Sequence, residues 1–382
     1  MVSSREKPVV LGTVPRGQVL RRETGWEIVF MQKWITDIVQ GRTFDATRQA
    51  KQDIANIGAS MGYRVANIFR YNDVGEDDDA MMARIDGITA AVGRGDMLVY
   101  QFPSLNSGRF DNLFVDQMHR RGVRVVCLVH DVGTLRDQQA PTWIDEIGYF
   151  NKCDVLIVHN RLMADRLREL GVTAPMVNQY LLDYLDDNHD EDRYETKPED
   201  FQRGVVLAGN ILKSRYLADW NNETPITVFG VTDDDLDKKL DANPKIDFRG
   251  QRWRWDLIQE MPREFGLAWD SDTSSYKYND YTRYNHPHKV SMYLGHGLPV
   301  IIWRQAAVAD IIVNNGLGIA IDSLDQVDDA IHSISDQDLA QMLHNVGEFG
   351  KLIRDGWFTR QALQEAEMKL LSPQFEIPAK LK

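Results

Sequence analysis

Short runs of β-branched and aliphatic residues alternate with segments of helical spacing along most of this chain. The alternation is typical of parallel β-sheets whose strands are joined by crossover helices. It predicts six strands in the first half of the chain, at 34–39, 64–69, 97–102, 123–130, 155–159 and 176–180. Six more are predicted in the second half, at 205–208, 226–229, 246–248, 266–269, 299–303 and 318–321. Helices are expected between them, for example over 45–61 and 160–170. The fold class is therefore α/β, with two parallel sheets.

The length of 382 residues exceeds what one hydrophobic core covers at roughly 150 residues per domain. A strongly acidic stretch at 185–202 has almost no apolar residues and is expected to be a linker. We expect one domain over 34–184 and another over 203–356. Residues 357–382 carry a helical pattern that would pack across the domains or contact another copy. Residues 1–33 are an extension of unclear role, with a strand predicted at 9–11.

Composition excludes several classes of protein. A net charge of −13 argues against a general nucleic-acid binder, because such binding depends on neutralising phosphates with cations. The apolar runs fall far short of the ~20 residues that span a bilayer, and no signal-peptide pattern is present. Cys127 and Cys153 each lie in an apolar run, which indicates buried thiols in a reducing compartment. A cytoplasmic location is expected.

The most informative segment lies after the predicted strand at 266–269. Pro287 suits the first turn of a helix, Asn285 or His286 can cap it, and Gly297 can end it. In such a helix the free backbone N–H groups, Lys289 and Ser291 would form an anion site at the carboxyl edge of the sheet. The alternative is an exposed lysine on an ordinary amphipathic helix.

Two further groups of residues are candidates for ligand binding. Asn210 ends a predicted strand and can donate a hydrogen bond to a phosphate or ribose oxygen, and a helix is expected near Lys213. Tyr281 and Tyr284 could stack on a base. The alternatives are a routine Gly-Asn turn and two surface tyrosines.

The order and spacing of several motifs resemble a family of bacterial sugar transferases. The motifs are YNHPHKVSMYL (284–294), LAGN (207–210) with KS (213–214), FGLAWD (265–270), and GDMLVYQFP (95–103) leading to HDV (130–132). The family includes the glucosyltransferase that extends GlcNAc on serine-rich adhesins and β-1,6-galactofuranosyltransferases. The resemblance covers about residues 34 to 370.

This resemblance implies a GT-B fold, in which two Rossmann-like domains face a central cleft. It implies that the second domain binds a UDP-sugar, that the first binds a glycan or glycoprotein acceptor, and that no metal or other cofactor is needed. It also implies a homo-oligomer, either a dimer or a tetramer. The positions carried over as donor-site residues are Asn210, Lys213, Tyr284, Asn285, His288, Lys289 and Ser291.

The implied reaction needs two kinds of group. Lys289 and the helix start would stabilise the charge that develops on the leaving UDP. Because the family makes β-linkages, the resemblance implies inversion of the anomeric centre, which needs a base on the first-domain side. His130, Asp131 and Asp45 are candidates for this base, although His130 could equally be a structural histidine.

Other functions are less consistent with the sequence. The acidic clusters 77–79, 233–235 and 270–272 could hold a hard cation, and only the last follows a predicted strand closely. The pair of His286 and His288 could ligate a transition metal, but no further Cys or His cluster completes such a site. A nicotinamide-dependent oxidoreductase is disfavoured because no strand is followed by G-x-G-x-x-G. A catalytically silent, transferase-like partner subunit remains the non-enzyme alternative.

Overall fold

The structure is a computed structural model. It describes residues 18–22, 25–29, 31–40, 46–137, 141, 143–186, 194–270, 272–273 and 276–371. Two sequence predictions, the strand at 9–11 and the candidate base Asp45, lie outside these residues.

The first domain is built on a six-stranded parallel sheet. Its strands, in spatial order, are β4 (Arg64–Phe69), β3 (Lys33–Val39), β5 (Met97–Phe102), β6 (Arg124–Val129), β7 (Val155–Val158) and β8 (Met176–Asn178). β5 and β7 are buried along their whole length, as expected for strands covered on both faces. All six strands were predicted from the apolar runs in the sequence.

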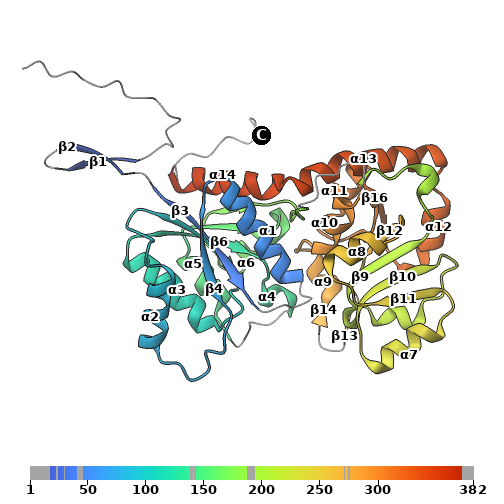
Figure 1. Ribbon diagram of the computed structural model, residues 1–382, viewed down its shortest axis with the longest axis horizontal. Helices are drawn as coiled ribbons and strands as arrows, with labels where there is room; N and C mark the ends of the chain where they lie inside the picture. The colour runs from blue at the N-terminus through green and yellow to red at the C-terminus, as the bar shows by residue number, and fades with distance from the viewer. Residues whose placement is uncertain are drawn as a thin grey trace, which may run out of the picture.

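Helices cover both faces of this sheet (Figure 1). They are α1 (Ala46–Ser60), α2 (Asp78–Ile88), α3 (Gly108–Arg120), α4 (Gly133–Arg136), α5 (Glu146–Lys152) and α6 (Arg161–Glu169). Side-chain caps define several helix starts: Ser107 accepts the Phe110 N–H, and Asn160 accepts the Met163 N–H. Because each cap follows a strand end, the helices begin at the carboxyl edge of the sheet.

The second domain repeats this architecture. Its parallel sheet has the order β11 (Ile246–Gly250), β10 (Ile226–Val231), β9 (Val205–Asn210), β12 (Phe265–Ala268), β15 (Val300–Trp303) and β16 (Gly318–Ile321). Its helices are α7 (Asp234–Ala242), α8 (Arg254–Glu260), α9 (Tyr278–Thr282), α10 (His288–Gly295), α11 (Ala309–Asn314), α12 (Val327–His332) and α13 (Asp336–Arg354). A short antiparallel pair, β13 (Asp272–Thr273) with β14 (Tyr276–Lys277), precedes α9. The predicted α/β fold with two parallel sheets is confirmed.

Helix α10 lies unusually close to the sheet of the second domain. A Cβ on Gly266 would meet the ring of Tyr293 at 2.2 Å, so only glycine in β12 lets the helix approach this far. The hydroxyl of Tyr293 then accepts the Ala208 N–H at 2.9 Å. The helix is therefore held rigidly against β9 and β12, which fixes the position of its first turn.

The last helix, α14 (Trp357–Leu371), returns to the first domain and covers β7 and β8 there (Figure 1). Its buried residues Ala362, Leu363 and Ala366 belong to the core beneath the first sheet. Asp183 caps its start by accepting the Thr359 N–H at 2.7 Å. The two domains are thus joined by the linker and by this helix.

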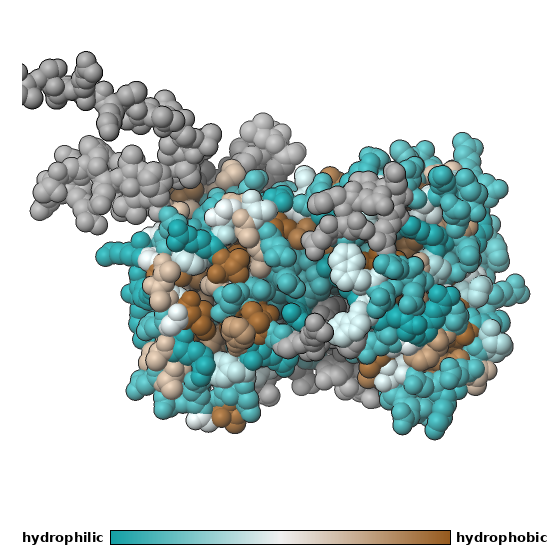
Figure 2. Space-filling view, viewed as in Figure 1, coloured by the Kyte–Doolittle hydropathy of each residue, from teal (hydrophilic) through white to brown (hydrophobic). Residues whose placement is uncertain are grey.

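The structure also places elements that the sequence pattern did not reveal. Strands β1 (Gln18–Arg22) and β2 (Gly25–Val29) form an antiparallel hairpin within the N-terminal extension. On the face shown in Figure 2, apolar side chains gather around β4. β4 is an edge strand, and its residues Val65 and Phe69 are 37% and 65% exposed. The first domain therefore presents an apolar edge to its surroundings.

Candidate active site

The predicted helix of the second domain is present as α10, but it starts differently. Pro287 occupies the capping position with ψ of 122°, and no side chain caps the helix. The prediction that Asn285 or His286 caps it is therefore wrong. His286 turns to the first domain instead, where its backbone N–H donates to His159 Nδ1 at 2.9 Å. Gly297, at φ of +75°, follows the helix end as predicted.

Three polar atoms near the start of α10 are buried without a hydrogen-bond partner among the described residues. They are Asn285 Oδ1, His286 Nδ1 and His288 Nε2. A buried polar atom that lacks a partner costs about 1–3 kcal/mol, so native proteins leave few of them unless a ligand or water binds there. Such atoms beside a helix N-terminus, where the free N–H groups favour anions, indicate a binding site.

Lys289, in the first turn of α10, forms an ion pair with Asp270. Its Nζ lies 2.8 Å from Asp270 Oδ1, and the side chains are only 15% and 17% exposed. Asp270 comes directly after Trp269 at the end of β12, so the sheet edge and the helix start meet in this pair. The ion pair holds the lysine in place, and it occupies the carboxylate that was the strongest metal-ligand candidate. Among the residues that the structure describes, no group of three His, Cys, Asp or Glu side chains could hold a metal ion.

Asn210 and Lys213 lie at the carboxyl end of β9, on the same edge of the sheet. The helix predicted near Lys213 is present as two short 3₁₀ helices, Ile211–Lys213 and Arg215–Asp219. Asn210 is exposed, and its Oδ1 accepts the Leu212 N–H at 3.0 Å. The side chain thereby caps the turn and leaves its amide N–H₂ directed away from that bond.

Other predicted binding residues are engaged within the protein. Tyr281 is buried, donates its hydroxyl to Asp131 Oδ1 at 2.7 Å and accepts the Val132 N–H at 2.9 Å. The hydroxyl of Ser291 is also buried and donates to the Leu182 carbonyl at 2.6 Å. Neither side chain offers a free face or hydroxyl to a ligand, so we leave both out of the proposed site.

Tyr284 lies in the same segment and is half-buried against the core of the first domain. Its carbonyl accepts from Asn160 Nδ2 at 2.8 Å. The segment from Tyr281 to Ser291 therefore ties the domains together, and its first-domain partners His159 and Asn160 follow β7. The sequence analysis missed both partners, although two polar residues after a wholly apolar strand were a usable signal.

On the first-domain side, His130 follows β6 and remains partly accessible. Its Nε2 lies 2.8 Å from Gln101 Oε1, and its backbone N–H donates to Phe102 O. Burial lowers the pKa of His130 well below its usual value; Lys51 lowers it further, as do His159 and His288 when they are protonated. Because His288 belongs to α10, the candidate base lies across the domain boundary from the candidate anion site.

Asp131 is less suited to proton transfer. It forms an ion pair with Arg136 and accepts the hydroxyl of Tyr281 and the Val132 N–H, so both of its oxygens are already engaged. Through these contacts Asp131 connects the loop after β6 to helix α9.

The histidines at the domain boundary are neutral at physiological pH. Burial lowers the pKa of both His159 and His288 to about 4, and the pKa of His286 well below its usual value. His159 and His286 stack across the boundary with ring centroids 5.2 Å apart. His286 Nδ1 and His288 Nε2 have no partner and can bind a ligand without the cost of burying a charge, whereas both ring nitrogens of His159 are bound within the protein.

Arg254, at the start of α8, was also missed by sequence analysis. Its guanidinium lies 3.7 Å from Asp53 Oδ1 of α1 and 4.3 Å from the ring centroid of Tyr184. Its charge acts on the nearby His288 and disfavours protonation of that ring.

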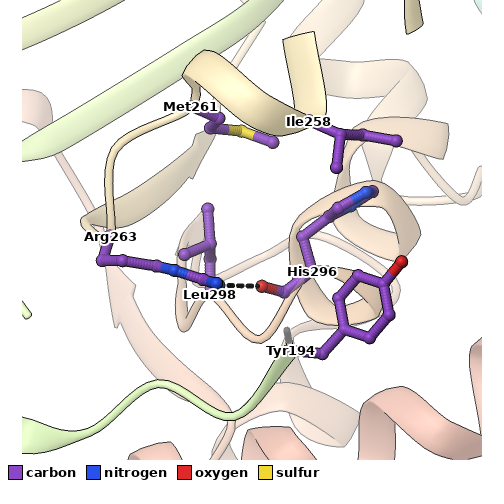
Figure 3. A pocket seen from close by; sticks show the side chains of 6 residues that line it. All are labelled: Tyr194, Ile258, Met261, Arg263, His296 and Leu298. Atoms are coloured by element: carbon purple, nitrogen blue, oxygen red, sulfur yellow. Dashed lines mark hydrogen bonds between the residues drawn. The ribbon is translucent and has the colours of Figure 1, made fainter. Parts of the chain in front are cut away.

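A small cavity lies at the other end of α10, lined by Tyr194, Ile258, Met261, Arg263, His296 and Leu298 (Figure 3). Most of its lining is apolar, and Arg263 donates to the His296 carbonyl at 2.9 Å. It is remote from the helix start and belongs to the packing of the linker against the second domain.

In the part of the chain that the structure describes, no helix is long and apolar enough to cross a membrane.

Residues 32–181 match the N-terminal domain, and residues 205–366 the C-terminal domain, of glucosyltransferase 3-like proteins. Glucosyltransferase 3 of Streptococcus gordonii is 27% identical over 330 residues, covering 85% of this chain and 94% of that protein. The β-1,6-galactofuranosyltransferase WbbI of Escherichia coli K12 is 31% identical over 273 residues, covering 71% and 78%.

Solved structures agree on the architecture. The crystal structure of Anabaena HepE in complex with UDP and glucose superposes with a TM-score of 0.56 at 12% identity, covering 89% of this chain and all of that one. At this identity the likeness shows the fold alone, which is GT-B, as predicted. The two matched domains together span most of the chain, and they coincide with its two sheets. The chain belongs to the glucosyltransferase 3-like family and is a hexosyltransferase.

Proposed function

We propose that this enzyme transfers a hexose from a UDP-sugar to a hydroxyl of a glycan or glycoprotein, with inversion and without a metal ion. The observation that carries the proposal is the cluster of unpartnered polar atoms around Lys289 at the start of α10, opposite His130. The names of the relatives, a glucosyltransferase and a galactofuranosyltransferase, support hexose transfer. The bound UDP and glucose in the HepE structure support the donor class.

The proposed donor site holds the diphosphate at the first turn of α10. Lys289 contributes a cation that Asp270 keeps oriented, and the helix N–H groups add their dipoles. The unpartnered Asn285 Oδ1 can accept from a hydroxyl of the sugar, and His288 Nε2 can bind the sugar or, when it carries the proton, the diphosphate. As the glycosidic bond to UDP breaks, negative charge grows on the diphosphate, and this fixed positive potential stabilises it. Asn210 and Lys213 are proposed to contact the nucleotide from the next strand end.

Donor class is tested by supplying a panel of UDP-hexoses and measuring UDP release. We expect release with at least one of them, and faster release when a glycan acceptor is added. No release from any UDP-sugar, together with no UDP binding by calorimetry, would remove the proposal. The choice between glucose and galactofuranose rests on contacts worth only ~1–3 kcal/mol, which the assay measures directly.

Metal independence gives a prediction for the same assay. We expect turnover in EDTA to equal turnover in magnesium within about twofold, because Lys289 and the dipole of α10 supply the charge that a metal would otherwise bring. Asp270, the candidate ligand after β12, is already paired with Lys289. Loss of turnover in EDTA with rescue by magnesium or manganese would contradict this prediction.

The acceptor is proposed to bind in an open pocket of the first domain. The pocket lies at the carboxyl ends of β3, β4 and β5, beside the end of β6 that carries His130. Its lining is mainly polar: Gln40, Arg70, Tyr71, Asn72, Asp73, Leu105, Asn106 and Ser107. Amide and carboxylate groups of this kind suit the many hydroxyls of a sugar. Asn106 Nδ2 is buried there without a partner, which supports a hydrogen-bonding ligand.

Asn106 offers a selective test of this pocket. Its Oδ1 accepts the Tyr71 N–H at 3.0 Å, so Asn106→Asp keeps that bond, removes the unpartnered donor and adds a negative charge. We expect the KM for the acceptor to rise by about 2- to 12-fold, the range for one hydrogen bond of ~0.5–1.5 kcal/mol, while the KM for the UDP-sugar stays unchanged. Asn112→Asp, at a half-buried position of α3 outside the pocket lining, is the control for the added charge. An unchanged acceptor KM would exclude Asn106 from the acceptor site.

Two further features are part of the proposal. The apolar edge at Val65 and Phe69 supports the homo-oligomer that the family resemblance implied. The two cysteines, both free and buried, support residence in a reducing compartment such as the cytoplasm.

A further inference from the structure

Gln101 is a fully buried polar residue at the carboxyl end of β5, next to His130. Its Nε2 donates two hydrogen bonds to backbone carbonyls, to Thr36 O at 2.5 Å and to Lys51 O at 2.9 Å. Its own backbone N–H donates to Thr36 Oγ1 at 3.0 Å. Carbonyl oxygens can only accept, so the NH₂ group must face them and the amide cannot be flipped.

This orientation decides the protonation of the neighbouring histidine. With Nε2 of Gln101 committed, the atom that faces His130 is Oε1, which can only accept. The 2.8 Å contact between Gln101 Oε1 and His130 Nε2 is a hydrogen bond only if His130 Nε2 carries the proton. In the neutral ring, Nδ1 then holds the lone pair. No described residue binds Nδ1, and it is not among the buried atoms that lack a partner.

We propose that Gln101 is a positioning residue, which holds His130 in the tautomer protonated at Nε2 and so presents Nδ1 as the proton acceptor for the acceptor hydroxyl. In this step the hydroxyl proton passes to Nδ1 while its oxygen bonds to the anomeric carbon and the bond to UDP breaks. The inference rests on the proposed function, in which His130 is the base. It assigns a role to a glutamine that neither contacts the cleft nor titrates.

The surroundings of His130 keep the ring neutral as well as oriented. Lys51, fully buried on α1, donates from Nζ to Gln101 O at 3.2 Å. Burial lowers the pKa of Lys51 to about 7, so only part of it is charged at physiological pH. The other titratable groups around the ring are His159 after β7, His288 on α10 and the neighbouring Asp131, which is paired with Arg136. Lys51, His159 and His288 all oppose a second proton on His130.

The tautomer is measured directly by ¹⁵N NMR of the full chain labelled at histidine. The chain has nine histidines, and the signal of His130 is assigned from its absence in His130→Asn. We expect a protonated Nε2 and an unprotonated Nδ1 in the wild type, and a tautomer mixture in Gln101→Met. The transfer rate of Gln101→Met should fall by on the order of 10-fold, with UDP affinity unchanged. The loss is smaller than for an enzyme locked in the wrong tautomer, because part of the mixture keeps the active one.

The matched control is Gln179→Met. Gln179 is equally buried and donates to Thr359 Oγ1 at 3.0 Å, far along the sheet from His130. It should leave the His130 spectrum unchanged. In a second variant, Gln101→Glu, the oxygen that replaces Nε2 meets the carbonyls of Thr36 and Lys51 and is expected to carry a proton, so the oxygen that faces His130 stays an acceptor. The His130 tautomer should then be kept, and transfer should fall less than in Gln101→Met.

Each outcome bears on a separate claim. A wild-type His130 that is protonated at Nδ1, or an unchanged tautomer in Gln101→Met, overturns the inference even if Gln101→Glu fails to fold. A locked tautomer in an enzyme whose His130→Asn variant still transfers sugar supports the tautomer assignment and overturns the base role in the proposed function.

Discussion

Replacing Lys289 with methionine is expected to weaken UDP binding by about 10- to 100-fold, because charge-assisted hydrogen bonds contribute ~1.5–3 kcal/mol and each ~1.4 kcal/mol is a factor of ten. The loss has a second cause. Asp270 lies 2.8 Å from the ammonium, and without it the carboxylate would face the incoming diphosphate as a like charge. Isothermal titration calorimetry with UDP measures the change, and thermal melting records any loss of stability.

The ion pair allows the two causes to be separated. Asp270→Asn removes the repulsion and keeps the lysine, so its UDP affinity should equal or exceed that of the wild type. In the double variant Lys289→Met with Asp270→Asn, the loss should shrink to the part due to the missing cation. Lys239→Met is the control, because that lysine pairs with Asp235 on an exposed helix face. Equal UDP affinity in Lys289→Met and the wild type would remove the donor site from α10.

The helix that carries Lys289 could be predicted from local sequence, but the environment of the lysine could not. Apolar spacing, Pro287 before the helix and Gly297 after it are local signals, and they located α10 to within a residue or two. The partner of Lys289 follows a different strand. Asp270 was interpreted as a possible metal ligand because the sequence does not reveal that the end of β12 and the first turn of α10 face each other.

The same limit explains why Tyr281 and Ser291 were predicted to bind a ligand, although both bind other parts of the protein. The hydroxyl of Tyr281 binds Asp131, 150 positions away, and that of Ser291 binds Leu182, 109 positions away. A hydroxyl on a predicted loop looks available until the opposing domain is in place. Periodicity therefore predicted both sheets, since each strand is a local apolar run. It did not predict contacts across the domain boundary, nor His159, Asn160 and Arg254, whose roles depend on those contacts.

His130 is a comparable case, because only its position after a strand was available from sequence. Two geometric facts now favour it over Asp131: its partly accessible ring lacks a bond at Nδ1, whereas the oxygens of Asp131 are held by Arg136 and Tyr281. The pocket proposed for the acceptor adjoins it on the same sheet edge. Asp45 follows β3, outside the described residues, and stays a prediction.

His130→Asn is expected to lower kcat by about 10²- to 10⁴-fold, the usual contribution of a general base, while UDP affinity changes less than about twofold. The amide keeps the polarity of the ring but cannot take up a proton. Initial rates at saturating UDP-sugar and acceptor give kcat, and calorimetry gives the affinity. Asp131→Asn should instead lower the melting temperature, and it should lower kcat much less than His130→Asn does.

The pH dependence supplies an independent check on the same residue. The base is active when neutral, and because burial holds the pKa of His130 well below 6.5, its neutral form persists into mildly acidic solution. The wild-type rate should therefore stay level from pH 8 down through 6.5 and fall only at more acidic values. If the base were a carboxylate, the acid limb of the pH–rate profile would not depend on His130. The variant His130→Asn would then keep that limb and a similar rate. If the variant retains wild-type kcat across this range, the proton is taken by another group.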